Sequence, residues 1–299
     1  MHITAWTSVA PRVNFNYGLS EVIMSERTIS ERSNQPSYAI GERAIDGLSR
    51  RDDAAPATMH RISRFRLTIL ALLSVLPSFL LRICYRWFFG YRIGKRVRIG
   101  FSIIDARDCQ IDDDVCIGHL NIVIGVAKLT IGDHVHIGHL NIIRGGEEVV
   151  LGRYAELKRM NEINSIPDPD IVNPADPRFF LGPGSIITTG HKIDFTDRVE
   201  IGRRTIIGGR NSSLWTHNRQ RTMPISIGDF AYVGSEIRMA PGSSIPPRCI
   251  VGIGAVITKR LDCHESLIGG VPAEPIKELS EHDRFLIERK TRPDLPDDV

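Results

Sequence analysis

The sequence predicts an all-β fold, a parallel β-helix preceded by an apolar, basic helix and followed by a short C-terminal helix. Pairs of an aliphatic residue and a small one recur at a spacing of six, as at Ile93-Gly94, Ile99-Gly100, Ile131-Gly132, Ile137-Gly138, Ile201-Gly202, Ile207-Gly208, Ile227-Gly228 and Val233-Gly234. In addition, the hexapeptide IGHLNI occurs at 117–122 and again at 137–142. A period of six fits neither an α-helix nor the simple alternation of a strand, whereas it is typical of a coil in which each hexapeptide forms one flat side.

The repeat also indicates how the core is built. The aliphatic residue of each hexapeptide points into a narrow prism, and stacked copies form a continuous apolar column. The residue after it lies near a corner, where glycine or a small polar residue tolerates the turn. About three hexapeptides, or ~18 residues, make one turn. The spacing of 20 residues between the two copies of IGHLNI therefore corresponds to one turn plus a small bulge. A series of ordinary hairpins would show Asn-Gly or Asp-Gly turns, which the repeat region lacks.

Two stretches interrupt the repeat. Residues 158–180 include Pro167, Pro169, Pro174 and Pro177, which cannot donate to a strand ladder. The stretch from Asn211 to Pro224 also drops the repeat. We expect both stretches to loop out of the coil, and such loops are where function is most often found.

Composition limits the function classes. The chain has 299 residues, 38 Lys and Arg against 35 Asp and Glu, a net charge of +3, and 42% hydrophobic residues. These values exclude fibrous and wholly disordered chains, and they argue against a nucleic-acid partner. The five cysteines include no CxxC pair and the first residues resemble no signal peptide, so we expect a reduced, cytoplasmic protein.

The chain divides into four parts. Residues 1–58 are rich in Ser, Arg and Glu without any period, so we expect a largely disordered leader. Residues 59–90 are predicted to form an amphipathic, membrane-associating helix. Residues 91–276 form the β-helix domain, and residues 277–299 a C-terminal helix and tail.

The segment before the repeat carries an unusual charge bias. Nine Lys and Arg lie between Met59 and Ile104, without one Asp or Glu. The apolar run from Leu67 to Leu81 contains Pro77 and is shorter than the ~20 residues that a spanning helix needs. We expect a helix in the plane of the membrane, peripheral on the inner face of the cytoplasmic membrane. A helix packed on the domain and a signal-anchor span are the alternatives.

The C-terminal half carries a family resemblance. The stretches PISIGDFAYVGSEIRMAPGSSIPPRCIVGIGAVITKRL (224–261) and IGGVPAEPIKEL (268–279) resemble the left-handed β-helix, or hexapeptide-repeat, acyltransferases. The stretch SIITTGHKIDFTDRVEIGRRTIIGGRNSSLWTH (185–217) is most similar to the sugar O-acetyltransferases of bacterial capsule and exopolysaccharide synthesis. The resemblance implies a left-handed coil, acetyl-CoA as donor, a homotrimer, and active sites between neighbouring prisms.

The chemistry of that family needs a general base, because a sugar hydroxyl is a poor nucleophile and a neutral imidazole can take its proton. His217, in the looped-out WTHN segment, matches the family's catalytic histidine. His191 is the competing base or substrate-site residue, and a corner or capping role is its alternative. Asp194 and Asp197 are candidates to orient either imidazole. Asn211 and Trp215 flank the loop as polar and stacking candidates for the sugar.

The resemblance also maps the donor site. It places the pantetheine arm along Gly234 and Ser235, and along the next corner at Gly252, Gly254 and Ala255. It places the nucleotide near Thr258, Lys259 and Arg260, where cations would meet a phosphate, and matches Lys277 to a basic position of the family. Glu274 stands where relatives often carry a basic residue, which disfavours phosphate there. The alternative for Lys259 and Arg260 is a solvated turn.

His134, His136 and His139 suggest a metal site, since γ-class carbonic anhydrases share this fold. The required HxxxxH spacing fails because Arg144 follows His139 by five residues, so we expect no metal. Asn121 and Asn141, in the repeated HLN, are interpreted as a stacked ladder.

The leading hypothesis is an acetyl-CoA-dependent O-acetyltransferase that acts on a sugar hydroxyl of a surface polysaccharide or its precursor. Transfer to an amino sugar or a small metabolite is the enzymatic alternative. A catalytically silent, membrane-associated scaffold is the alternative from another class.

Overall fold

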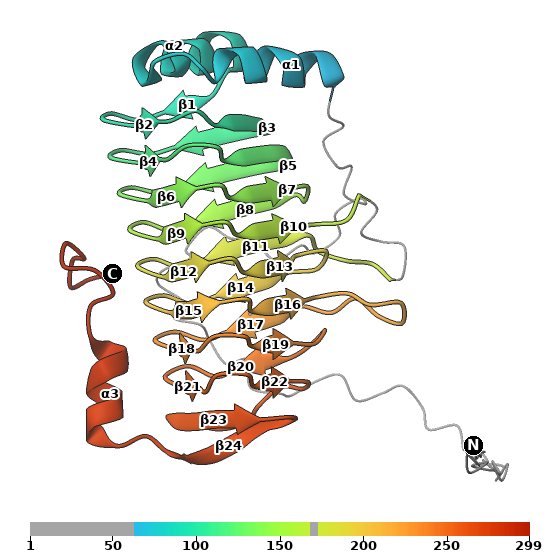
Figure 1. Ribbon diagram of the computed structural model, residues 1–299, viewed down its shortest axis with the longest axis vertical. Helices are drawn as coiled ribbons and strands as arrows, with labels where there is room; N and C mark the ends of the chain where they lie inside the picture. Colours follow the sequence, from blue (N-terminus) through green and yellow to red (C-terminus); the bar gives the residue numbers. More distant parts are fainter. Residues whose placement is uncertain (1–62, 168–172) are drawn as a thin grey trace, which may run out of the picture. The chain divides into compact units, whose positions relative to one another are not determined.

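The computed structural model describes residues 63–167 and 173–299, which fall within one compact unit. They form a three-sided coil of parallel strands with two helices across one end and a third helix alongside (Figure 1). Each strand pairs with the strand one turn later, as in the register Ile117↔Ile137. The predicted parallel β-helix is therefore confirmed, while the predicted leader, residues 1–58, lies outside the described residues.

Each turn contributes one strand to each of three faces. The first face consists of β1 (Arg92–Ile93), the ends of β3 (Ile103–Ile111) and β5 (Ile122–Ile131), β8 (Glu148–Leu151), β11 (Arg178–Leu181), β14 (Val199–Ile201), β17 (Ile225–Ile227) and β20 (Ser244–Ile245). The second face consists of β2 (Arg98–Ile99), β4 (Cys116–Ile117), β6 (His136–His139), β9 (Glu156–Arg159), β12 (Ile186–Thr189), β15 (Ile206–Arg210), β18 (Tyr232–Val233), β21 (Ile250–Val251) and β23 (Ser266–Gly270). The third face consists of the beginnings of β3 and β5, β7 (Ile142–Arg144), β10 (Glu162–Asn164), β13 (Lys192–Asp194), β16 (Ser213–Trp215), β19 (Arg238–Met239) and β22 (Val256–Ile257).

We name the corners by the faces that they join. The first corner joins the first face to the second, the second corner joins the second to the third, and the third corner joins the third to the first face of the next turn. The coil makes about nine turns.

The core is the predicted aliphatic column. Ile117, Ile137, Leu157 and Ile187 succeed one another on the second face and are all buried. Each such side chain contributes roughly 1.5–3 kcal/mol by leaving water. Glycine follows Ile117 and Ile137, and the next turn requires it, since a Cβ on Gly138 would lie 1.9 Å from the Lys158 carbonyl oxygen.

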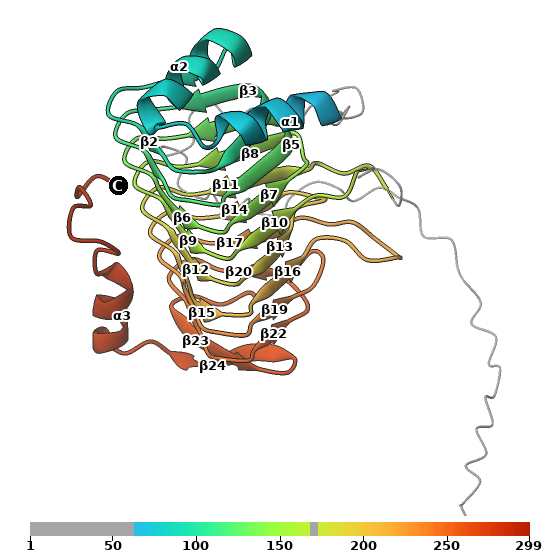
Figure 2. The same cartoon turned by 45° about the horizontal axis from the view of Figure 1, so that its top comes forward.

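The apolar segment before the coil forms two helices, and the prediction of one helix over 59–90 is wrong in this respect. Helix α1 covers Arg64–Leu73 and helix α2 covers Ser78–Phe89. Pro77 separates them, because proline lacks the N–H that a continuous helix would need there. The pair lies across the N-terminal end of the coil (Figure 2). Within the described residues, no helix is long and apolar enough to cross a membrane.

The C-terminal end closes differently from the predicted boundary. Strand β24 (Ala273–Glu278) turns back antiparallel to β23, so residue 277 is in a strand. Helix α3 (Glu281–Glu288) follows, with a capping box between Ser280 and Asp283. The tail then returns along the first corner, where Leu295 is buried.

Candidate functional site

His217 lies on a tight hairpin at the third corner. The segment between β16 and β17 folds back on itself, with a bridge between His217 and Thr222 and a bond from the Met223 N–H to the Thr216 carbonyl (2.8 Å). The Asn218 side chain accepts hydrogen bonds from the N–H groups of Gln220 and Arg221. The predicted interruption over 211–224 is too long, because residues 213–215 form β16 within the coil; the part after β16 is an ordered loop (Figure 1, beside β16).

The Asp194 carboxylate, at the end of β13 one turn earlier, lies beneath this hairpin and is buried. Its Oδ2 accepts bonds from the Thr216 N–H (2.9 Å), the Thr216 hydroxyl (2.6 Å) and the His217 N–H (3.2 Å). Its Oδ1 accepts the Thr196 hydroxyl (2.6 Å). These donors stabilise the charged carboxylate and fix its position.

The His217 imidazole is paired with this carboxylate. Its Nδ1 lies 2.8 Å from Asp194 Oδ2, and the side chain is 26% exposed. A carboxylate at Nδ1 holds the proton on that nitrogen, which leaves the lone pair of Nε2 available. An imidazole oriented in this way can take a proton from a bound hydroxyl group.

The predicted interruption over 158–180 is also too long, because it contains β10 and the start of β11, and the segment between these strands supports the hairpin. Asn173, in the segment between β10 and β11, accepts the Thr222 N–H at 2.7 Å and donates to the Thr222 carbonyl at 3.1 Å. Nearby, the Asp176 carboxylate accepts two bonds from the Arg198 guanidinium, at 2.9 and 2.7 Å. Sequence reasoning missed Asn173, Asp176, Arg198 and the two threonines, because none of them belongs to the repeat.

The remaining predicted substrate residues are divided between two corners. Asp197 lies near Asp194, but its Oδ1 accepts the N–H groups of Asp176 and Arg198, and no hydrogen bond joins it to an imidazole among the described residues. Trp215 is 46% exposed and lies two residues before His217. Asn211 lies at the second corner, at the opposite end of β16 from His217, in a left-handed conformation with φ of 60°.

His191 belongs to a ladder at the second corner. The predicted stacking of Asn121 and Asn141 is confirmed, with Asn141 Nδ2 donating to Asn121 Oδ1 at 3.0 Å, and Asn161 continues it. The His191 N–H then donates to Asn161 Oδ1 at 3.0 Å. The imidazole is fully buried and both ring nitrogens are occupied, by the Ser212 N–H and the Thr188 hydroxyl.

Burial lowers the pKa of His191 to about 4. A neutral, fully enclosed imidazole cannot reach a substrate, so this geometry supports the corner alternative for His191. His217 is the histidine of the pair that opens to solvent.

The predicted donor residues also lie at two corners. Gly234, Ser235, Gly252, Gly254 and Ala255 are at the second corner on successive turns, with the Gly254 N–H bonded to the Ser235 carbonyl at 3.0 Å. A Cβ on Gly254 would meet nothing within 4 Å, so this corner is open. Thr258, Lys259 and Arg260 are at the third corner, two turns beyond His217.

The charges at this end are partly paired. Lys259 Nζ lies 2.8 Å from Glu274 Oε1, so the residue that departs from the family pattern neutralises one of the predicted phosphate cations. Lys277 is exposed on β24.

The histidines considered for a metal are dispersed. His134 stacks on Tyr154 at the first corner, whereas His139 stacks on His119 at the second. His136 lies on β6 between them. Within residues 63–167 and 173–299, no group of three His, Cys, Asp or Glu side chains is arranged to hold a metal ion.

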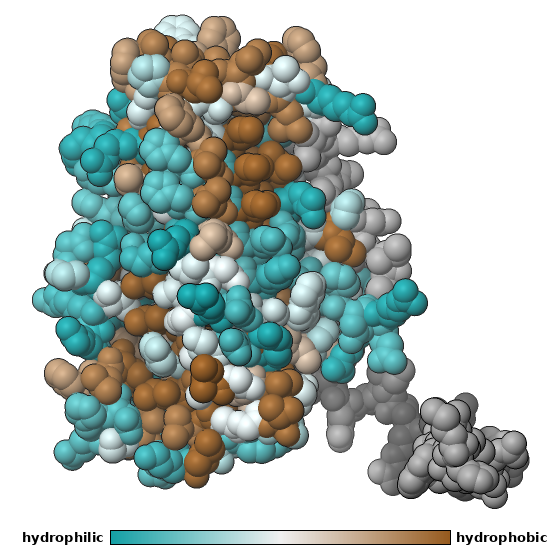
Figure 3. Space-filling view, viewed as in Figure 1, coloured by the Kyte–Doolittle hydropathy of each residue, from teal (hydrophilic) through white to brown (hydrophobic). Residues whose placement is uncertain are grey.

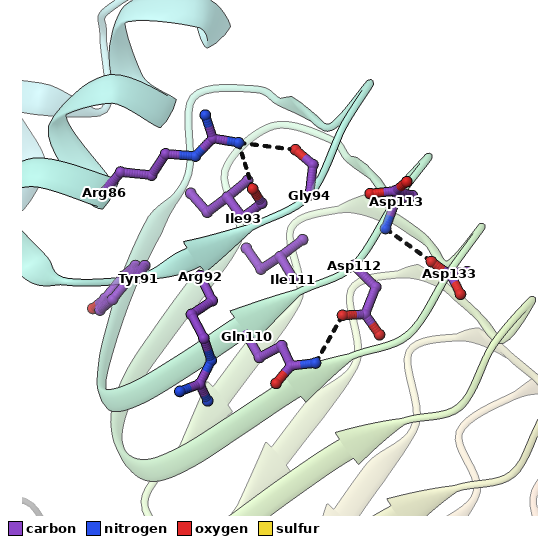
Figure 4. A pocket seen from close by; sticks show the side chains of 10 residues that line it. All are labelled: Arg86, Tyr91, Arg92, Ile93, Gly94, Gln110, Ile111, Asp112, Asp113 and Asp133. Atoms are coloured by element: carbon purple, nitrogen blue, oxygen red, sulfur yellow. Dashed lines mark hydrogen bonds between the residues drawn. The ribbon is translucent and has the colours of Figure 1, made fainter.

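A hollow of about 650 Å³ lies beside α2 near the N-terminal end of the coil, away from His217 (Figure 4). Arg86 bonds there to the carbonyls of Ile93 and Gly94, and Gln110 donates to Asp112 at 2.9 Å. Its lining contains none of the predicted site residues.

Comparison with known proteins bears on the fold and on one short stretch of sequence. No protein-family model matches the chain. The chain is 30% identical over 63 residues to galactoside O-acetyltransferase of Escherichia coli (strain K12), which covers 21% of this chain and 30% of that protein. The structure of UDP-N-acetylglucosamine acyltransferase from Campylobacter jejuni matches with a TM-score of 0.51 and 17% identity, over 66% of this chain and 77% of that one. The chain is a left-handed β-helix of the hexapeptide-repeat kind.

Other matches to this hexapeptide-repeat protein are weaker. The polysialic acid O-acetyltransferase OatWY matches with a TM-score of 0.27 and 16% identity, over 63% of this chain and 88% of that one. The chain spans less than a third of the length of the curated relative that it matches. The predicted resemblance and handedness are confirmed, and the hexapeptide-repeat protein shares with its relatives the fold and a short segment of sequence.

Proposed function

We propose that the protein is an acetyl-CoA-dependent O-acetyltransferase that acts on a sugar hydroxyl of a surface polysaccharide or its precursor. The observation that carries this proposal is the pair formed by Asp194 and His217, in which Nδ1 lies 2.8 Å from a buried carboxylate and the imidazole side chain is 26% exposed. The galactoside O-acetyltransferase that shares 30% identity over 63 residues supports both the acyl group and the class of acceptor.

The roles of the two side chains follow from their geometry. The sugar hydroxyl oxygen attacks the thioester carbonyl carbon, while His217 Nε2 accepts the hydroxyl proton. The new C–O bond forms as the C–S bond breaks, and the imidazolium returns its proton to the departing sulfur. Asp194 stabilises the imidazolium during the interval in which it carries the extra proton.

The donor would lie along the open second corner, at Gly234, Ser235, Gly252, Gly254 and Ala255. In one protomer this corner is separated from His217 by the third face, which β16, β19 and β22 cross. A neighbouring copy whose second corner faces the third corner of the first would bring donor and base together. We therefore propose a homotrimer with sites between its subunits.

The testing experiment compares His217→Ala with His264→Ala. His264 is a matched control because its side chain is 82% exposed and lies outside the site. With acetyl-CoA and a panel of sugars, we expect His217→Ala to lower turnover by roughly 10²–10⁴-fold. Acetyl-CoA affinity should stay near the wild-type value, and His264→Ala should behave as wild type.

Acetyl transfer by His217→Ala at the wild-type rate would contradict the proposed base. Acetylation of amino sugars in place of hydroxyl groups would retain the base and change the acceptor class. Wild-type protein that releases no coenzyme A with any acceptor would favour the scaffold alternative.

A further inference from the structure

The outer surface of the helix pair α1 and α2, which we call the cap, is strongly apolar. Eight large apolar side chains project from it into solvent: Phe65, Leu72, Val75, Phe79, Leu80, Ile83, Trp87 and Phe88. Trp87 is 82% and Phe88 77% exposed. Figure 3 shows apolar side chains gathered over this end of the molecule.

The inner surface of the cap is firmly packed on the coil, so the exposed side chains are held in place. Leu70, Leu81 and Tyr85 are fully buried against the first turn. Arg66 donates to the buried Asp105 at 2.6 Å, and the Tyr85 hydroxyl accepts the Ile104 N–H at 3.2 Å. The outward side chains therefore form a second face of these helices, which no described residue covers.

Cations border this apolar face. Five basic residues of the cap and the first turn form no ion pair with any described carboxylate: Arg64, Arg82, Arg86, Lys95 and Arg98. Arg82 and Arg98 share a hollow of about 420 Å³ with Arg96, Val97 and Asp114. With three guanidinium groups and one carboxylate, this hollow is positively charged and lies just behind the apolar surface.

We propose that the cap docks on an anionic phospholipid bilayer, with its apolar side chains among the acyl chains and the Arg82–Arg98 hollow at the depth of the phosphates. Apolar side chains in front of a layer of cations match the order of acyl chains and anionic headgroups in a membrane. A symmetric contact between two copies of the cap would place the same cations against one another, which electrostatic repulsion disfavours.

The experiment measures sedimentation of the full chain with vesicles at 0.1 M salt. One set of vesicles contains equal parts of phosphatidylglycerol and phosphatidylcholine, and the other contains phosphatidylcholine alone. Two double variants are compared with the wild type. One combines Arg82→Gln with Arg98→Gln and removes cations, and the other combines Trp87→Ser with Phe88→Ser and removes apolar side chains. The control is Arg144→Gln with Arg289→Gln, which removes two exposed arginines outside the cap.

We expect the wild type and the control to bind the anionic vesicles alike. Loss of Arg82 and Arg98 should weaken this binding about 25-fold, at about fivefold for each cation near an anionic surface. Loss of Trp87 and Phe88 should weaken it at least tenfold, and should do so in 1 M salt as well, because apolar burial is not screened. Unchanged melting temperatures show that the variants are folded. If the variant with Arg82→Gln and Arg98→Gln is not folded, the variant with Arg64→Gln and Lys95→Gln replaces it.

Two results would overturn the proposal. In one, the wild type binds neither kind of vesicle, and light scattering shows that the variant with Trp87→Ser and Phe88→Ser has a lower mass than the wild type. This result would show that a second copy of the chain covers the apolar face. In the other, the control loses as much binding as Arg82→Gln with Arg98→Gln. This result would show that the net charge of the protein, and not the Arg82–Arg98 hollow, attracts it to the vesicles.

Discussion

Asp194 and His217 divide two tasks between a fixed group and an accessible one. Four hydrogen bonds from the N–H and hydroxyl groups of Thr196 and Thr216 hold Asp194, while His217 contacts it through Nδ1 and through its own N–H. Because the carboxylate is held independently of the imidazole, its charge and its geometry can be separated by substitution.

Asp194→Asn keeps an oxygen that can accept from Thr216 and from His217 Nδ1, but it removes the charge that stabilises the imidazolium. Asp194→Ala removes both. We expect kcat to fall by roughly 10–100-fold in the first variant and by roughly 10²–10⁴-fold in the second, with KM for acetyl-CoA little changed. Steady-state kinetics of the two variants tests this order. Equal losses in both would show that the charge, and not the orientation, carries the effect.

His191 makes the stability of the fold depend on pH. Its folded pKa of about 4 lies below the ordinary value of 6.5, so the unfolded chain binds a proton more readily than the folded one. Protonation would also place an N–H on Nδ1 against the Ser212 N–H that now donates to it. The contribution of His191 is complete above pH 6.5 and falls, by up to about 1.4 kcal/mol per pH unit, as the pH drops toward 4.

His191→Asn places at this corner the residue that Asn121, Asn141 and Asn161 already provide on earlier turns. We expect the variant to lose less stability than the wild type between pH 6.5 and pH 4.5. Urea unfolding at several pH values measures the difference. Parallel curves for the two proteins over this range would contradict the prediction.

At the scale of elements, the two loops at the third corner, between β10 and β11 and between β16 and β17, act as one unit. Asn173 in the first loop binds the backbone of Thr222 in the second loop, and Thr222 is bridged to His217. Both loops therefore determine where the imidazole lies, although only one of them contains it.

Asn173→Ala removes both bonds to Thr222 and frees the hairpin from its neighbour. We expect kcat to fall about tenfold, since a loosely held imidazole spends less time in line with the hydroxyl. The melting temperature should change little, because both loops lie outside the aliphatic column. Asn173→Asp, which keeps the acceptor for the Thr222 N–H, should recover part of the loss. A variant with full kcat would show that the hairpin is rigid on its own.

At the scale of the whole molecule, the coil exposes an apolar stripe along its second corner. Its members are Phe101, Leu120, Leu140 and Met160, on successive turns, each at least 47% exposed. Exposed apolar residues aligned in this way are typical of a surface that a partner covers.

We expect light scattering to give a mass about three times the 33.4 kDa of the chain. Leu140→Lys should shift the mass toward one chain, because it places a charge in the contact that the trimer buries. Phe285→Ser, on the exposed side of α3, serves as the control and should leave the trimer intact. An active wild type with the mass of one chain would rule out shared sites.

The sequence by itself determined the coil and its core. The six-residue period follows directly from the geometry of the fold, since each hexapeptide repeats the same local environment and Ile117, Ile137 and Leu157 must all point inward. For the same reason the Asn121–Asn141 ladder and the two interruptions could be predicted, because each is a feature of the repeat or a departure from it. His217 as the candidate base came from the resemblance, supported by its place in an interruption.

Only the tertiary structure decided what surrounds that base. Asp194 and His217 are 23 residues apart, and Asn173 and Thr222 are 49 apart, so their contacts depend on how turns with insertions of different length stack. The same stacking placed His191 inside the ladder and Asn211 at the opposite end of β16, which no local pattern revealed. A repeat specifies the environment within a turn, whereas a site at a corner is made of residues that become neighbours only when the turns are stacked.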